Sequence, residues 1–223
     1  GFSADGLSVQ FISRRSVFTN RYFQLYTVST TGGLPQKIDI PNVFYASFSP
    51  DSKSMAYTPL YDAFRQWKNY RGGTISTIWK LNLSDYSVFE MPKPSEGCND
   101  IYPMWVGNKI FFLSDRMGEF NLFSFDNSTE EIIQLTRYKD FPILSASTDG
   151  DNIIFEQGGY LYKYNIASSS TKKLTIGIAA DLLELRSRYV SGSNYIRSAH
   201  ISPTGVRAVF DFRGEIITLP AEK

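Results

Sequence analysis

The residues with the most chemical potential form one segment in which cations alternate with aromatic side chains. Residues 64–74 read Phe-Arg-Gln-Trp-Lys-Asn-Tyr-Arg-Gly-Gly-Thr, and the two glycines allow the backbone to turn tightly. Lys68 and Arg71 are suited to bind an anion such as a peptide carboxylate, because both carry charged donors. In the alternative interpretation, which the chemistry alone favours, the cations stack on Trp67 and Tyr70 and cover the core.

A second basic cluster consists of Arg14, Arg15 and Arg21, and its first two members follow an expected strand. Its functional interpretation is again a basic site for an anion. The alternative is an ordinary charged loop, and the residues alone favour it.

The rest of the chain offers little catalytic chemistry. It has one histidine, His200, so neither a zinc site nor a Ser-His-Asp triad is expected. No serine lies in a Gly-x-Ser-x-Gly elbow. Asp115 and Asp126 flank an expected strand, where carboxylates ordinarily shape loops. We therefore expect no catalytic residue, no metal and no cofactor in this chain, and a structural role for His200.

Composition limits the function classes further. The chain has 223 residues, is 42% hydrophobic and 15% aromatic, and carries a formal net charge of +1. This balance gives no electrostatic reason to expect nucleic acid or an acidic membrane as partner. No apolar run approaches the roughly 20 residues that span a bilayer. The single cysteine, Cys98, excludes an internal disulfide.

Two short patterns recur along the chain and predict what must position these side chains. One has a polar residue, Ile or Leu, usually an aromatic residue, a spacer and an apolar residue. Its copies are Gln24–Val28, Thr77–Leu81, Asn121–Phe125, Tyr160–Tyr164 and Glu215–Leu219. The other is a turn that leads into an apolar strand. Its copies begin at Phe2, Phe48, Trp105, Ala146 and Ile201. A repeat of about 45 residues made of short strands predicts an all-β chain of propeller blades, each a four-stranded antiparallel sheet.

The spacing of the repeats predicts the division of the chain. Residues 176–195 lose the repeat, and this stretch exceeds the usual connection of about 4–6 residues. We expect a propeller segment at 1–178, a linker at 179–194 and another blade at 195–223. Because the first and last blades each lack a strand, we expect about four and a half blades that belong to a longer protein.

The basic segment also carries a specific resemblance. Trp67–Thr74, followed by Ile78-Trp79, resembles the Trp-Lys-Arg-Tyr-Arg-Gly-Gly signature of the tricorn protease family, with Asn69 in place of the usual Arg. Further matching segments occur in the same order and cover nearly the whole chain. They are Pro103–Trp105, Phe112–Arg116, Gln157–Tyr162 and Gly214–Lys223.

The resemblance implies a fold and a function. Tricorn-like proteins are serine peptidases that degrade short peptides, with a six-bladed propeller, a seven-bladed propeller and then a catalytic domain. On that map, 1–178 holds later blades of the first propeller and 195–223 begins the second. Basic residues of the first propeller hold the peptide's terminal carboxylate in this family, which makes Arg14, Arg15, Lys68 and Arg71 the candidate binding residues. Arg71 is the least suited, because structural glycines follow it.

The same resemblance implies short peptides, a catalytic domain of the same polypeptide and further copies of the chain as partners. It implies that the chain itself is not catalytic and serves as a peptide channel. A cytoplasmic location is expected, and a periplasmic one stays open. The alternative is a TolB-like propeller scaffold that binds a protein partner and has no enzymatic activity.

Overall fold

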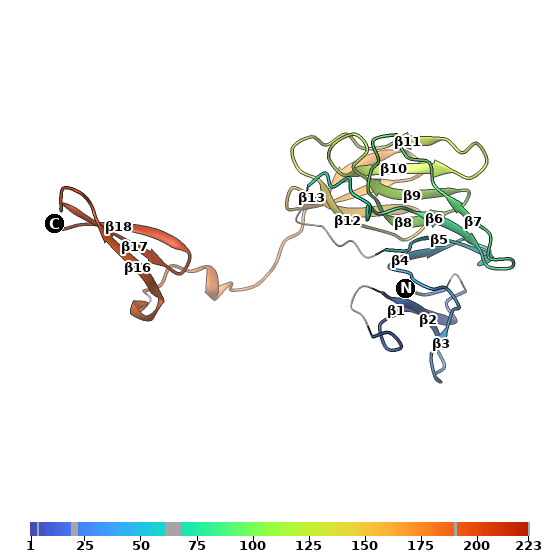
Figure 1. The fold of residues 1–223 in the computed structure, drawn as a ribbon, viewed down its shortest axis with the longest axis horizontal. Coiled ribbons are helices and arrows are strands. Elements are labelled where there is room, and N and C mark those ends of the chain that lie inside the picture. The colour runs from blue at the N-terminus through green and yellow to red at the C-terminus, as the bar shows by residue number, and fades with distance from the viewer. Residues whose placement is uncertain (4, 19–21, 61–67, 190, 223) are drawn as a thin grey trace. The chain divides into compact units, whose positions relative to one another are not determined.

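The computed structural model describes residues 1–3, 5–18, 22–60, 68–189 and 191–222. Within these residues the chain forms five antiparallel sheets of three or four strands, each with its strands in sequence order (Figure 1). The all-β prediction and the prediction of propeller blades are confirmed. The first sheet contains β1 (Ser8–Ser13), β2 (Gln24–Ser29) and β3 (Gln36–Lys37).

Three four-stranded sheets follow. The second sheet contains β4 (Tyr45–Phe48), β5 (Ser54–Thr58), β6 (Trp79–Asn82) and β7 (Val88–Glu90). The third contains β8 (Asp100–Val106), β9 (Lys109–Ser114), β10 (Asn121–Asp126) and β11 (Ile132–Gln134). The fourth contains β12 (Ile143–Thr148), β13 (Asn152–Gln157), β14 (Tyr160–Asn165) and β15 (Ser170–Lys173). The aromatic repeat of the sequence is the third strand of each sheet, β6, β10 and β14.

Two copies of the recurrent turn, those at Ser3 and Ser49, have the same side-chain hydrogen bonds. The Ser49 hydroxyl donates to Asp51 Oδ1 over 2.6 Å and accepts from the Ser54 backbone N–H over 2.9 Å. Ser3 bonds to Asp5 over 2.6 Å in the same way. These hydroxyl bonds favour the charged carboxylate, and they lower the pKa of Asp5 and of Asp51 below the ordinary 3.8. The turn is thus fixed by its own side chains.

The core lies between consecutive sheets. Leu25 of the first sheet packs with Met55 and Leu81 of the second. The second and third sheets share a cluster that includes Ala56, Phe112 and Phe125. A third cluster joins the third sheet to the fourth, with Ile101, Leu113, Ile143 and Phe155 among its members. The first strands β4, β8 and β12 also contact one another in order. This face-to-face packing of broad side chains explains the high aromatic content.

The chain divides into two compact units, Gly1–Thr175 and Ile176–Lys223. The second unit contains the 3₁₀ turns η1 (Leu183–Leu185) and η2 (Ser193–Tyr195) and the sheet β16 (Ile196–Ile201), β17 (Arg207–Phe212) and β18 (Glu215–Pro220). Its assignment to a second propeller stays a prediction. Among the described residues, no helix is long and apolar enough to span a membrane.

Candidate functional site

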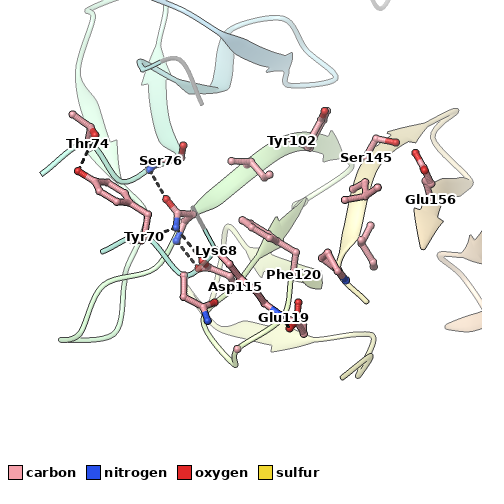
Figure 2. Close-up of a pocket in the computed structure, with 17 residues that line it drawn as sticks. Lys68, Tyr70, Thr74, Ser76, Tyr102, Asp115, Glu119, Phe120, Ser145 and Glu156 are labelled. Carbon is pink, nitrogen blue, oxygen red and sulfur yellow. Dashed lines mark hydrogen bonds and ion pairs between the residues drawn. The ribbon is translucent and has the colours of Figure 1, made fainter. Parts of the chain in front are cut away.

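A pocket of about 510 Å³ lies where the basic segment meets the third and fourth sheets. Tyr70 and Thr74 lie at one end of it, Ser145 and Glu156 at the other, and Phe120 between them (Figure 2). The end of the basic segment, β8, the β9–β10 turn, β12 and β13 all contribute to its walls. Residues far apart in the sequence therefore form one cavity within the first unit.

Arg71 attaches the basic segment to the third sheet. Its Nη1 lies 2.7 Å from Asp115 Oδ2, and its Nη2 donates to the Asp115 carbonyl over 3.2 Å. The Asp115 carboxylate also accepts from the Asn99 backbone N–H over 2.7 Å and from Asn99 Nδ2 over 2.9 Å. The side chain of Asp115 is 2% exposed and that of Arg71 29%. Arg71 is thus engaged in a largely buried network.

Gly72 allows Tyr70 to fold back over the backbone. A Cβ atom at Gly72 would overlap the Tyr70 ring, with Cε2 only 2.8 Å away, whereas a Cβ at Gly73 would meet open space. The Tyr70 hydroxyl accepts a hydrogen bond from Thr74, and the Tyr70 carbonyl accepts one from Asn99 Nδ2. The first of the two glycines therefore has a packing role.

Lys68 forms an ion pair with Glu119 at the edge of the pocket. The Lys68 side chain is 66% exposed, and the Glu119 side chain is 14% exposed. Lys68 and Glu119 are both in the pocket wall, so a ligand carboxylate at Lys68 would compete with Glu119. The predicted stacking on Trp67, like the predicted cation Arg21, lies outside the described residues.

Arg15 and Arg116 occupy equivalent positions in two blades. The Arg116 guanidinium lies 5.3 Å from the Phe112 ring centre and 5.4 Å from that of Phe123, and its Nε donates to Ser114. The Arg15 guanidinium lies 5.1 Å from the ring centre of Phe11 and 4.9 Å from that of Tyr26, and its Nε donates to Ser13. The two aromatic pairs are register partners in their own sheets.

The two arginines differ in what they bind. Arg116 Nη2 donates to both carboxylate oxygens of Asp100, each over 3.1 Å, and the Asp100 side chain is fully buried. For Arg15 the part of the chain that the structure describes provides no ion-pair partner. Arg14 also has none there, and its guanidinium lies 4.3 Å from the ring centre of Phe23. Both arginines are exposed.

Cys98 lies beside the buried ion pair of Arg116 and Asp100. Its Sγ is 3.4 Å from Asp100 Oδ1, and burial, followed by the nearby Asp100 charge, raises the pKa of the thiol to about 12. Burial lowers the pKa of the Lys93 ammonium nearby, which donates to the Ser76 carbonyl over 3.0 Å. These contacts make Cys98 an inert core residue.

Neither His200 nor the acidic side chains of the described residues form a catalytic or metal-binding cluster. His200 is exposed on β16, opposite Val209. Within the described ranges, no group of three or more His, Cys, Asp or Glu side chains is arranged to hold a metal ion.

Comparison with known proteins identifies the family. Residues 1–170 match the sequence model of the tricorn protease N-terminal beta propeller domain. The chain belongs to this family. A tricorn protease homolog of Saccharolobus solfataricus is 29% identical over 159 residues, which cover 71% of this chain and 14% of that protein. The tricorn protease of Thermoplasma volcanium is 26% identical over 204 residues, which cover 91% of this chain and 19% of that protein. This tricorn-family chain therefore spans less than a fifth of the length of either relative.

Solved structures agree on the fold of this tricorn-family propeller. The crystal structure of the tricorn protease superposes with a TM-score of 0.53 at 20% identity, over 98% of this chain and 26% of that one. A putative TolB from Agrobacterium tumefaciens gives a TM-score of 0.60 at 16% identity, over 78% of this chain and 62% of that one. Both likenesses show the propeller fold alone.

The cations of this site were predicted from the sequence, but the side chains that bind them were not. Asp115 was expected to shape a loop, and the roles of Asn99 and Glu119 were not predicted. One signal was available, because Phe11-x-Ser13-x-Arg15 and Phe112-x-Ser114-x-Arg116 share a spacing. That spacing indicates equivalent arginines in different blades.

Proposed function

We propose that this chain is the non-catalytic propeller portion of a tricorn-type serine peptidase, and that Arg14 and Arg15 hold the terminal carboxylate of short peptides. The observation that carries the proposal is the equivalence of Arg15 and Arg116. Arg116 holds the carboxylate of Asp100 while stacked on two rings, and Arg15 has the same stack and no acidic partner in the described residues.

Stacking makes these arginines better anchors. An arginine side chain gives up about 2 kcal/mol of rotamer entropy when it is fixed, and the aromatic rings together with the Ser13 hydroxyl already restrict Arg15. Arg14 is restricted in part by Phe23. A ligand carboxylate would then gain charge-assisted hydrogen bonds, worth roughly 1.5–3 kcal/mol each, at little further cost in ordering.

Lys68 and Arg71 remain proposed binding residues of lower rank. At Lys68 a peptide carboxylate would have to displace Glu119 from an ion pair in which the Lys68 side chain is 66% exposed and the Glu119 side chain 14% exposed. At Arg71 it would have to displace Asp115 from a buried network, which leaves a desolvated carboxylate unpaired. We therefore assign Arg71 mainly to positioning the basic segment, and we assign the primary anchor to Arg14 and Arg15.

The carboxylate anchor is tested with one peptide in two forms. Ala-Ala-Phe as a free acid and as a C-terminal amide are titrated calorimetrically against the 223-residue chain. We expect the free acid to bind at least about tenfold more tightly, and Arg15→Gln to abolish that preference. Arg213→Gln is the matched control, because Arg213 also lies over an aromatic ring, that of Tyr195, but in the second unit. Equal binding of the two forms would overturn the anchor.

We propose in addition that the chain is part of a longer polypeptide. We propose a catalytic domain in the same polypeptide, assembly with further copies and a cytoplasmic location. Sequencing the source reading frame past the codon for Lys223 tests the first of these. A second propeller followed by a domain with a catalytic serine is the expected result. A stop codon within a few blades, with no such domain, would favour the TolB-like scaffold instead.

A further inference from the structure

We propose that the 510 Å³ pocket binds the free amino end of a short peptide whose first residue is apolar. This inference rests on the proposed function in one respect, that the ligand is a peptide. It concerns the opposite end of the peptide and a different set of side chains from the Arg14–Arg15 anchor.

The pocket has an apolar floor of the right kind for a side chain. Ile101 and Ile143 are almost fully buried members of the core cluster that joins the third and fourth sheets, and Phe120 packs against them. Leu144 adds apolar surface and is 53% exposed. A side chain the size of Leu or Phe gains about 1.5–3 kcal/mol when it is fully buried on such a surface.

The charges of the pocket wall favour a ligand with a cationic group. The wall has three carboxylates, those of Asp115, Glu119 and Glu156. Arg71 neutralises the first and Lys68 the second. Glu156 is partly buried, and no cation pairs with it in the described part of the chain. In the described residues, the three carboxylates of the wall are thus paired with only two cations. We expect a cationic group of the ligand to bind at the end of the pocket where Glu156 lies (Figure 2).

The acceptors near Glu156 suit an ammonium group. Ser145 and Glu156 are register partners on β12 and β13, and both line the same end of the pocket, to which they contribute a hydroxyl oxygen and a carboxylate. An ammonium has three donors and needs several acceptors. At this end of the pocket an anionic group would be repelled by the Glu156 carboxylate, which has no cation partner in the described residues. The combination of acceptors and apolar floor therefore favours a primary amine attached to an apolar body.

The experiment uses peptides without a C-terminal carboxylate, so that the Arg14–Arg15 anchor does not contribute. Leu-Leu-amide and N-acetyl-Leu-Leu-amide are titrated calorimetrically against the full 223-residue chain. We expect the free amine to bind about tenfold more tightly than the acetylated form, since one charge-assisted contact is lost on acetylation. Glu156→Gln should bring the free amine down to the affinity of the acetylated form, and Ser145→Ala should weaken it less.

Controls separate this proposal from folding effects and from the anchor. Glu131→Gln changes an exposed glutamate outside the pocket and should leave binding unchanged. Thermal unfolding of Glu156→Gln shows whether the variant is folded, and Ser145→Ala supplies a second variant if it is not. The amide of lysine acetylated on its α-amino group (N-acetyl-lysine amide) keeps the charged side chain and tests a basic side chain in place of an amino end. We expect it to bind more weakly than Leu-Leu-amide, because its apolar body is smaller.

The outcomes of the two proposals are distinguishable. Equal binding of free and acetylated amides, or an unchanged affinity in Glu156→Gln, overturns the amino-end site even if Ala-Ala-Phe acid still prefers Arg15. N-acetyl-lysine amide binding as tightly as Leu-Leu-amide also overturns it, in favour of a site for basic side chains. If the amine preference holds while the acid and amide forms of Ala-Ala-Phe bind equally, the anchor fails and the pocket stands.

Discussion

Asp115→Ala should be one of the most destabilising single changes near the candidate site, because one buried carboxylate holds the basic segment against the third sheet. The substitution removes the acceptor of three hydrogen bonds, one from Arg71 and two from Asn99. It leaves the Asn99 backbone N–H and the Arg71 guanidinium without their partner. The remaining bond from Arg71 to the backbone carbonyl of residue 115 does not replace a charge.

The magnitude follows from burial. Removing one partner of a buried ion pair costs about 3–5 kcal/mol, because the other charge is left desolvated. Arg71 is 29% exposed and can regain part of its hydration, which lowers the expected cost to about 2–4 kcal/mol. For a chain of this length, each kcal/mol corresponds to a change in Tm of roughly 2–4 °C. The expected loss is therefore about 4–16 °C in Tm of the first unit.

The assay is thermal unfolding followed by tyrosine and tryptophan fluorescence, with urea unfolding as a second probe. Lys37→Ala is the matched control, because it removes one partner of an exposed ion pair with Asp39 in the same unit. The side chains of Lys37 and Asp39 are 40% and 91% exposed, so the carboxylate left behind stays hydrated and we expect a cost of about 0–1 kcal/mol. If Asp115→Ala melts within 2 °C of the unsubstituted chain, or no lower than Lys37→Ala, the reasoning from burial is refuted.

Three further predictions test other features of the structure. Gly72→Ala should destabilise the chain by about 1–3 kcal/mol because its Cβ overlaps Tyr70, whereas Gly73→Ala should be neutral or slightly stabilising in the same melting assay; equal effects would contradict the packing role. Cys98 should not react with a disulfide reagent in the native chain at pH 8 and should react fully in urea, since burial raises the pKa of its thiol to about 12; rapid native reaction is the opposing result. Because the native carboxyl pKa of Asp5 and of Asp51 is lowered, both carboxylates stabilise the native state at pH values above the ordinary pKa of 3.8. This contribution is lost as the pH falls through the lower native pKa. If an NMR titration gives either carboxyl a native pKa of 3.8 or higher, the hydroxyl bonds do not act as described.

The strands were predictable because their signal is local. The repeats Asn121–Phe125 and Tyr160–Tyr164 alternate along the chain, and the structure places them in β10 and β14. The turn at Ser49 was predictable for the same reason, since its bonds join residues no more than five positions apart.

The partners of the cations were not predictable in this way. Arg71 and Asp115 are 44 positions apart and meet only because two consecutive blades pack face to face. Which loops of neighbouring blades meet depends on blade twist and loop length, and no local pattern encodes them. The sequence also could not predict that the Arg15 guanidinium has no acidic partner in the described residues, because this is recognised only by comparison with Arg116, which binds Asp100 in the folded blade.

The central claim is that Arg15 receives a peptide carboxylate as Arg116 receives Asp100. The most direct measurement is the arginine Nε–Hε NMR spectrum of the chain during titration with Ala-Ala-Phe as the free acid. The account predicts that the Arg15 signal shifts with saturation, that the Arg14 signal follows it, and that Arg116 does not respond because its carboxylate is already in place. An unmoved Arg15 signal at saturating peptide would contradict the account.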